Sequence, residues 1–432
     1  METILGLLIL LIIILFFIKF EVGVALYMLY FFLVPYMNIH LGITLGYNFI
    51  NLIMLIGFIF NYKLLHNYRL DWKPTLPIIV YYLLFLLIMP LQSDTPLNFM
   101  FSMWRSEAMM NIIFVFVIWN LILFNKDYLK LFNIVLLTSI FTATAYGLFL
   151  TTTPGFNPYI LTMSSINHIV FDADEVAAIG DGRVFGRISS VFTHPMTYAL
   201  FLGLSTMYLM ERLSHSSKAV NIFLLVLVLI NVVTCGVRSA ILALFVAIGV
   251  YIISRRKFKL LLIICTIGGI AYLCMQQNDD LNNYLSSLTD IYNKKGQVGG
   301  SDLEMRLNQL EGALKEMSTN PLAGKGYKWH TYYLSKYEGH PSILYFESLI
   351  YVILCDGGLL GVFIWIIFIF LLTRTIKKLR VQSFIPYCSI IYYLIFSIIT
   401  GEYGYMKYFI IFYTLTLGMS YYSSKSKLSY EQ

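Results

Sequence analysis

The chain of 432 residues is 59% hydrophobic and 12% charged, with a net charge of +7 and a mean hydropathy of +0.75. Soluble globular domains contain about 45–50% apolar and about 25% charged residues, so this composition excludes a soluble protein. The apolar runs are about 17 to 25 residues long and lack the alternation of strands, which predicts an all-α polytopic membrane protein and excludes an outer-membrane barrel.

The apolar runs predict about 13 transmembrane helices, with a range of about 12 to 14, because each run can cross about 30 Å of hydrocarbon as a helix. All of them belong to a single integral membrane domain, residues 1–432. The predicted spans are 2–18, 22–38, 44–61, 76–91, 108–124, 131–150, 196–210, 219–235, 239–254, 259–275, 347–372, 384–400 and 408–421. The first lacks the basic segment and the cleavage site of a signal peptide, so we expect a retained helix.

The distribution of Lys and Arg among the short loops predicts the orientation. Basic residues follow every odd-numbered span, and cytoplasmic loops carry the positive excess. This pattern places the C-terminus in the cytoplasm, the N-terminus outside, and the two long loops, 151–195 and 276–342, on the outer face. The net positive charge is then a topology signal, and we expect no nucleic-acid partner.

The second long loop contains a predicted amphipathic helix over 301–318. Ser301 and Glu304 form a capping box at its start, and Asn320-Pro321 ends it. Apolar residues recur on one face at Leu303, Leu307, Leu310, Leu314 and Met317. We expect this face to lie on the bilayer surface or on the spans.

A glycine-rich turn, Gly324-Lys325-Gly326-Tyr327, follows this helix. Its flexibility allows a close approach to a ligand, but a plain connection between two elements is an equal interpretation. It lacks the spacing and the strand context of a phosphate-binding P-loop.

Four arginines stand against apolar sequence: Arg105, Arg183, Arg187 and Arg238. A charged side chain there costs several kcal/mol unless it is paired or hydrated. All four fall at the outer edge of the membrane in the predicted topology. Guanidinium groups bind phosphate bidentately, so together they can form a phosphate or diphosphate receptor. Alternatively, each extends to the interface or pairs with an acid such as Glu107.

Candidates for proton transfer lie on the same side. Glu347 stands in an apolar run, where burial raises the pKa of a carboxyl group toward that of a working base. Its alternative role is a structural partner for an arginine. His340 and His194 are further candidates, either catalytic or structural. Asp356, followed by two glycines, either pairs with a basic group or lines a polar pocket.

We expect no metal and no cofactor. An acidic cluster lies in the first long loop, at Asp172, Asp174, Glu175 and Asp181, but it lacks the order and spacing of an EF-hand and is typical of a solvated loop. The five Cys residues fall in or beside apolar segments, which favours packing over disulfides or thiolate metal sites.

Several short motifs occur in a characteristic order over roughly residues 180–372. They are Arg187-x6-His194-Pro195, Arg238-Ser239, Arg306, Asn320-Pro321-Leu322-x-Gly324-x-Gly326 and Gly358-Leu359-Leu360-Gly361. This order resembles the O-antigen ligase and Wzy-type polymerase superfamily of integral membrane glycosyltransferases. The resemblance implies metal-independent transfer of a glycan from an undecaprenyl diphosphate donor to an acceptor hydroxyl, on the outer (periplasmic) face of the bacterial inner membrane.

The resemblance also implies roles for single residues. Arg187 and Arg238 match diphosphate-binding arginines and Arg306 matches the loop-helix arginine, whereas Arg105 matches by topology alone. Ligases of the family typically carry a His-Asn pair where this chain has Glu347-Ser348. The base is then Glu347, or His340 supplies it from the loop.

The missing ligase histidine favours a polymerase, which joins oligosaccharide repeat units, over a ligase, which transfers the finished glycan to lipid A core. The arginines would stabilise the diphosphate, and Glu347 would take the proton of the acceptor hydroxyl. Trp329, Tyr332 and His194 are candidates for sugar or acceptor binding, although aromatic residues at a membrane edge also serve as interfacial anchors.

The expected partners are an undecaprenyl-diphosphate-linked oligosaccharide, membrane lipids and a chain-length regulator protein. Two other classes of function stay open. A flippase or transporter of lipid-linked glycans predicts charges at mid-membrane and related halves, whereas the charges here collect at the outer face. A structural or regulatory role in polysaccharide assembly is the second.

Overall fold

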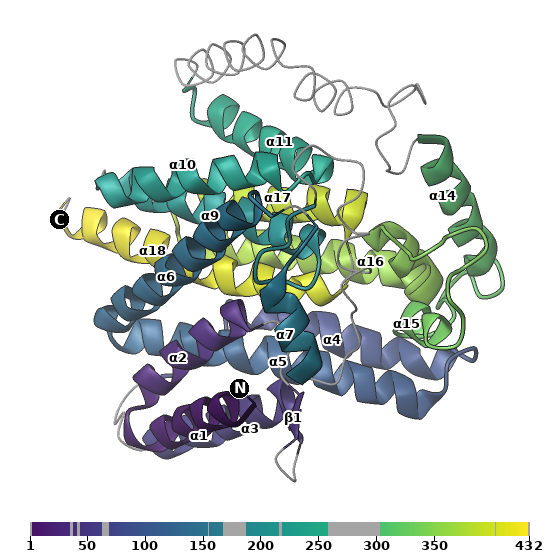
Figure 1. Ribbon diagram of the computed structural model, residues 1–432, viewed down its shortest axis with the longest axis horizontal. Coiled ribbons are helices and arrows are strands. Elements are labelled where there is room, and N and C mark those ends of the chain that lie inside the picture. Colours follow the sequence, from purple (N-terminus) through teal and green to yellow (C-terminus); the bar gives the residue numbers. More distant parts are fainter. Residues whose placement is uncertain are drawn as a thin grey trace.

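The computed structural model describes residues 2–34, 38–40, 44–62, 69–153, 155–166, 187–215, 218–257, 303–401 and 403–430. Over these residues the chain forms a bundle of α-helices with one short antiparallel hairpin (Figure 1). The predicted fold class, an all-α polytopic membrane protein, is therefore confirmed. The predicted span 259–275 and Arg183 lie outside the described residues.

The elements in chain order are α1 (Glu2–Ile18), α2 (Phe20–Leu33), β1 (Asn38–His40), β2 (Thr44–Gly46), α3 (Tyr47–Tyr62), α4 (Leu76–Ile88), η1 (Met89–Leu91), α5 (Leu97–Phe124), α6 (Lys126–Leu150), α7 (Pro158–Ile166), α9 (Pro195–His215), α10 (Ala219–Thr234), α11 (Arg238–Ser254), α14 (Leu303–Met317), α15 (Trp329–Leu334), α16 (Leu349–Lys378), α17 (Ile385–Thr400), η2 (Tyr403–Tyr405) and α18 (Met406–Tyr430). Among these, α5, α6 and α16 are long and apolar enough to cross a membrane. Seven shorter apolar helices accompany them in the described part of the chain. The total of about 13 spans stays a prediction.

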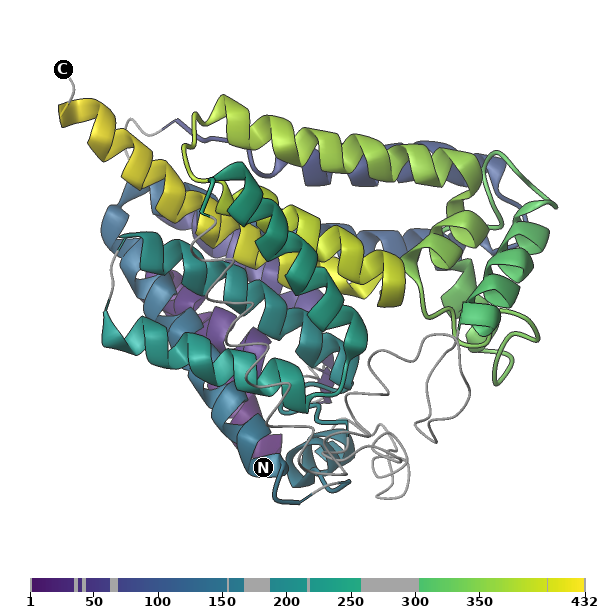
Figure 2. The ribbon, with the colours of Figure 1, turned by 90° about the horizontal axis from the view of Figure 1, so that it is seen from above.

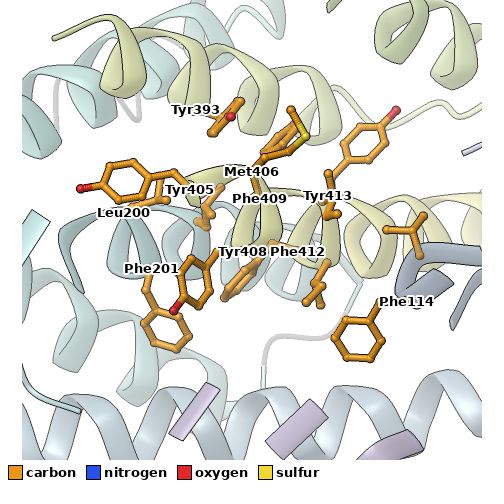
Figure 3. Close-up of a cluster of buried hydrophobic side chains, with 14 of the residues drawn as sticks. Phe114, Leu200, Phe201, Tyr393, Tyr405, Met406, Tyr408, Phe409, Phe412 and Tyr413 are labelled. Carbon is orange, nitrogen blue, oxygen red and sulfur yellow. The ribbon is translucent and has the colours of Figure 1, made fainter. Parts of the chain in front are cut away.

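The last helix, α18, forms the centre of the bundle. All of its residues from 408 to 420 are buried, as expected of a helix that is apolar on every side. Figure 3 shows its aromatic rings packed against side chains of other helices. Phe409 stacks on Tyr393 of α17 with ring centroids 4.1 Å apart, and Phe412 meets Phe201 of α9 edge-on at 5.5 Å. Helices from distant parts of the sequence are thereby held around one axis.

Helix α16 is broken at Gly358, whose φ of 57° and ψ of −150° are not helical. Residues 359–378 after the break are long enough, at about 1.5 Å per residue, to cross about 30 Å of hydrocarbon. Residues 349–357 before the break therefore form a separate short segment at the N-terminal end of α16. Figure 2 shows the segments of α14 and α15 at that end of the bundle, away from the C-terminus.

The loop over 320–326 supplies hydrogen bonds to the broken helix. The amides of Leu359 and Leu360 donate to carbonyl oxygens of residues 321 and 322, both at 3.0 Å. In the opposite direction, the amides of Lys325 and Gly326 donate to carbonyls of residues 355 and 356, at 2.8 and 3.1 Å. A backbone group left without a partner in a membrane costs several kcal/mol. The glycine-rich turn is therefore a structural connection that completes α16.

Two glycines allow this close contact. Gly324 and Gly358 both have left-handed φ, +70° and +57°, where a side chain is strained. A Cβ atom on Gly324 would lie 2.6 Å from backbone atoms of residues 356–358, and one on Gly358 would lie 2.7 Å from the Gly324 amide nitrogen. The two backbones therefore meet with no space for a side chain on either residue.

The amphipathic helix is present as α14, Leu303–Met317, and the face that packs on the protein is not the one that carries Leu307 and Leu314. Leu307 and Leu314 are 56% and 45% exposed, whereas Gln309 and Ala313 are fully buried. Small residues let a helix approach its neighbour closely; Gly312 lies directly against Ser342. The exposed leucines suit contact with the bilayer surface.

We predict that Gly358→Ala destabilises the protein by about 2 kcal/mol or more, because a left-handed alanine costs about 1–2 kcal/mol and its Cβ meets backbone atoms that cannot move aside. Thermal unfolding of the purified protein in detergent measures this loss. Gly249→Ala in α11 is the matched control, since a Cβ there meets nothing within 4 Å. It should be neutral or stabilising by up to about 1 kcal/mol. Equal melting temperatures for both variants would refute the close backbone contact between Gly324 and Gly358.

Candidate functional site

Residues from four separate segments meet at the end of the bundle where α17 ends and α16 begins. Arg187 precedes α9, Arg238 is the first residue of α11, Arg306 lies on α14, and Glu347 precedes the N-cap residue of α16. We call these four residues the arginine–glutamate cluster. Each is half-buried, so it is fixed by neighbours while it keeps access to a ligand.

The last turn of α17 is the common anchor of this cluster. The hydroxyls of Ser239 and Thr400 lie 2.6 Å apart and join α11 to α17. The hydroxyl of Ser348, the N-cap of α16, donates to the carbonyl of residue 398 at 2.5 Å. The guanidinium of Arg306 donates to the carbonyl of Ile399. The last carbonyls of a helix lack intrahelical partners and carry partial negative charge, so a cation and hydroxyl donors are favourable there.

Electrostatics couple three members of the cluster directly. Burial lowers the pKa of Arg187, the negative charge of Glu347 raises it, and the positive charge of Arg238 lowers it, with a net decrease. The guanidinium nevertheless stays charged, because its ordinary pKa is above 12. Arg187 and Arg238 lie within each other's field, and with Arg306 they outnumber the single carboxylate of Glu347. The cluster therefore has an excess of positive charge. Such a site attracts an anion.

Tyr351 belongs to this site although the sequence interpretation did not include it. Its hydroxyl donates to the backbone carbonyl of Arg306 at 3.0 Å, and it interacts with the side chains of Arg306 and Glu347. Tyr351 lies in the first turn of α16, whereas Glu347 precedes the helix. No helical spacing connects the two residues, so no sequence pattern indicated Tyr351.

His340 serves as an anchor of the loop in this structure. The residue is 6% exposed. Its Nδ1 accepts hydrogen bonds from the amides of Ser342 and Ile343, at 3.2 and 3.1 Å. The proton of a neutral ring is then on Nε2, which lies 3.3 Å from the carboxylate of Glu316. Both ring nitrogens are thus engaged within the protein.

The candidates for acceptor binding differ in their exposure. Trp329 is 6% exposed; its ring packs against Tyr333 at 5.2 Å and carries the ammonium group of Lys325 at 4.9 Å. Tyr332 is half-buried and accepts a hydrogen bond from Lys336 at 2.6 Å. His194 caps the first turn of α9, where its Nδ1 accepts the amide of residue 196 at 3.1 Å.

Arg105 and Glu107, which lie on α5, do not pair with each other in the described contacts. Arg105 is exposed. Glu107 binds the ammonium group of Lys328 at 2.6 Å and the hydroxyl of Tyr327 at 2.5 Å. The acid that the sequence offered as an arginine partner thus holds the loop after Gly326 on α5.

Asp356 pairs with His330, the first of the two roles that the sequence left open for it. Asp356 is fully buried. One carboxylate oxygen accepts the backbone amide of His330 at 3.0 Å, and the other lies 2.7 Å from its Nδ1. The pair fixes the start of α15 against the break in α16. His330 had no distinguishing pattern around it, so the sequence did not indicate it.

A second ion pair holds α14 on the same loop. Glu316 lies 2.6 Å from Lys325, which also approaches Asp94 at 3.5 Å. Burial raises the pKa of Glu316, but hydrogen bonds and charges from Lys325 and His340 outweigh burial and lower it. Burial lowers the pKa of Lys325, but Glu316 and Asp94 together raise it. The charged forms of both partners are therefore favoured in the folded protein.

Residues 223–366 match a family model described as O-antigen ligase. The match covers about one third of the chain and includes Arg238, Arg306 and Glu347, while Arg187 lies before it. No curated protein matches this chain. The resemblance to the O-antigen ligase and Wzy-type superfamily is thus confirmed for this segment, and members of that family are glycosyltransferase-like membrane enzymes.

We predict that Glu316→Gln lowers the stability of the protein at neutral pH by about 1–2 kcal/mol, because it removes a partly buried ion pair. A carboxyl group with a lowered folded-state pKa stabilises above its ordinary pKa of 4.5 and loses this effect as the pH falls through the folded value. The difference from wild type, measured by thermal unfolding, should therefore hold from about pH 7 down to about pH 5 and shrink as the pH falls below 4.5. Glu311→Gln, exposed on the same helix, should change little at either pH. A pH-independent difference for Glu316→Gln would contradict the ion-pair assignment.

Proposed function

We propose, on the basis of the O-antigen ligase match, that this protein is a polymerase of polysaccharide repeat units. It moves a glycan from undecaprenyl diphosphate to the acceptor hydroxyl of another lipid-linked repeat unit, on the outer face of the bacterial inner membrane. The observation that carries the proposal is the gathering of Arg187, Arg238 and Arg306 around Glu347 at the end of α17. Three of these four residues lie within the matched segment 223–366.

The chemistry needs two kinds of group, and the cluster supplies both. The bond between the anomeric carbon and the diphosphate oxygen breaks, so negative charge develops on the leaving diphosphate. Guanidinium groups oriented before the reaction stabilise such charge without a metal ion. The acceptor oxygen forms the new bond and its proton passes to Glu347, the general base. In this role Arg187 and Arg238 bind the diphosphate, and Arg306 completes the receptor from α14.

The proposal of a polymerase over a ligase rests on Glu347-Ser348, which stand in place of the family's His-Asn pair. Ser348 is engaged as the N-cap of α16 and as a donor to α17, which leaves Glu347 as the polar group that faces Arg187. His340 is the alternative base, but its ring is used by the loop backbone and Glu316. A ligase-type transferase remains the second candidate because the matching family model carries that description.

The partners of this reaction are proposed from the same site. The substrates are undecaprenyl-diphosphate-linked oligosaccharides, which approach through the membrane lipids, and a chain-length regulator protein is a further partner. Tyr332, which is half-buried, is more exposed than Trp329 and is the candidate of the two that can stack on a sugar ring. Trp329 and His194 would support the site by packing and capping.

Deletion of the gene should leave a single repeat unit attached to its anchor, because each chain extension requires the polymerase. Electrophoresis of surface polysaccharide from the deletion strain and from the complemented deletion strain measures this directly. Loss of all attached glycan would instead identify a ligase. Lipid-linked intermediates retained on the cytoplasmic side would identify a flippase, and an unchanged pattern would remove polysaccharide assembly from consideration.

Substitution of cluster residues should abolish chain extension while the protein still inserts. Arg187→Ala, Arg238→Ala and Arg306→Ala should each lower the rate about 10²–10³-fold, as for loss of one donor to developing charge. Glu347→Gln should lower it about 10²–10⁴-fold, as for loss of a general base. Chain lengths on gels and transfer rates with purified protein measure these effects.

The matched control is Lys315→Ala, which removes an exposed cation from the same helix as Arg306 and should leave chain length unchanged. His340→Ala should lower stability more than the rate of the folded fraction. Wild-type chain lengths in all three arginine variants would refute the diphosphate receptor. A larger effect of His340→Ala than of Glu347→Gln on the rate would move the base to His340.

A further inference from the structure

A polar cavity lies at the end of the bundle opposite to the arginine–glutamate cluster. Its volume is about 770 Å³. It is lined by the first turns of α6, the ends of α9, α11 and α18, and the segment that begins α17. The cluster lies at the last turn of α17 and this cavity at its first, so about 24 Å of helix separates them. The positive-inside rule assigns the cavity to the cytoplasmic face.

The cavity is strongly positive. Its lining includes five Lys or Arg side chains, and none of the described residues that line it is acidic. The cations are Lys126, Lys130, Arg212, Arg255 and Lys257. They come from three different helices and the residues that follow them, which are brought together only by the fold.

Neutral groups orient most of these cations. Arg212 donates from Nε to the side-chain oxygen of Asn221 at 3.1 Å, Arg255 donates to the carbonyl of residue 382, and Lys257 donates to the hydroxyl of Tyr251 at 2.8 Å. Lys126 lies over an aromatic ring at 5.7 Å. Such partners hold a side chain in place without cancelling its charge. Lys130 differs, because it pairs with exposed Asp127 at 2.7 Å.

A buried carboxylate, that of Glu211, is bonded to residues that line the cavity. Glu211 is fully buried and accepts hydrogen bonds from the hydroxyls of Ser420, at 2.5 Å, and Ser383. The ring of His215 lies 2.9 Å from the same carboxylate. These contacts use both oxygens of Glu211 and join α9, α17 and α18. The residues around the cavity are therefore held by specific contacts, and the carboxylate of Glu211 is hydrogen-bonded within the protein.

The starts of two helices add to the positive potential, whereas the ends of α9 and α11, which also border the cavity, oppose it. Helices α6 and α17 both begin at the cavity, and the N-terminus of a helix carries a partial positive charge that favours anions. In α6 the side chain of Asn125 accepts one of the first free amides at 2.9 Å, so the start of this helix is well defined. Lys and Arg residues that only mark the cytoplasmic side of a membrane protein would not need to converge on one cavity together with helix N-termini.

We propose that this cavity binds the phosphate group of an anionic phospholipid of the cytoplasmic leaflet. Phosphate is the anion that several converging cations and helix N-termini recognise together. Leu129, Ile385 and Met419 line the cavity beside the cations, which suits an amphipathic ligand with apolar groups next to its charge. The volume lies within the range of about 300–1,000 Å³ for ligand pockets, and basic pockets between transmembrane helices on the cytoplasmic side bind phosphate headgroups.

The test compares lipid binding by the full-length protein, purified in nonionic detergent and stripped of lipid. Phosphatidylglycerol is titrated while bound lipid is counted by native mass spectrometry, with phosphatidylcholine as the zwitterionic counterpart that has no net charge. The variant carries Lys126→Gln, Arg255→Gln and Lys257→Gln. Each juxtamembrane cation contributes about fivefold to the affinity for an anionic lipid, so the affinity of this variant for phosphatidylglycerol should fall about a hundredfold.

The control carries Lys218→Gln, Arg256→Gln and Lys425→Gln, which remove the same charge from exposed positions outside the cavity lining. It should bind like wild type. Inorganic phosphate is added in a separate arm: competition by phosphate alone at equal affinity would identify a soluble phosphate as the ligand of the same site. Equal lipid binding by the two triple variants, both monodisperse in gel filtration, would overturn the proposal. The readout is independent of glycan transfer, so it stands whether or not the polymerase assignment does.

Discussion

A break in a membrane helix leaves backbone groups without intrahelical partners, and the part of this protein that holds the arginine–glutamate cluster depends on how those groups are satisfied. The loop over 320–326 lies along the break in α16 and exchanges four backbone hydrogen bonds with it. Only glycine fits at Gly324 and Gly358, because their backbones are in contact and both have left-handed φ. This contact fixes the loop, and the ion pairs of Lys325 and Lys328 extend it to α14 and α5. The positions of Arg306 and Glu347 follow, since one lies on α14 and the other just before α16.

The last turn of α17 completes the site for a similar reason. Its carbonyl groups need donors, and Ser348 before α16 and Arg306 on α14 supply two of them. Ser239 on α11 joins the same turn through the hydroxyl of Thr400. A helix end is thus the point at which distant segments meet. The two ends of α17 border different groups: its last turn lies at the arginine–glutamate cluster, and its first turn borders the cavity with Lys and Arg. If both proposals hold, a substrate diphosphate and a lipid phosphate are bound at opposite faces of one bundle.

Some features of the fold and the site could be predicted because they depend on local sequence. Apolar runs longer than about 17 residues predicted the membrane helices, and Asn320-Pro321 marked the end of the loop helix. The leucine spacing in α14 predicted a helix with its apolar stripe on the bilayer surface or on the spans; Leu307 and Leu314 are exposed, and Ala313 packs inward. Periodicity identifies an apolar stripe, whereas the side that packs depends on how closely the partner approaches.

The sequence by itself determined that the protein is an all-α membrane protein and that its ordered motifs resemble those of the O-antigen ligase superfamily, because hydrophobic run length and motif order are read along the chain. Only the tertiary structure decided which residues meet. Glu107 binds Lys328 instead of an arginine, Asp356 binds His330, and Tyr351 joins Glu347 and Arg306. Many of these partners are separated by tens to hundreds of residues. Their pairing arises from the packing of whole helices, which no local pattern of residue types encodes.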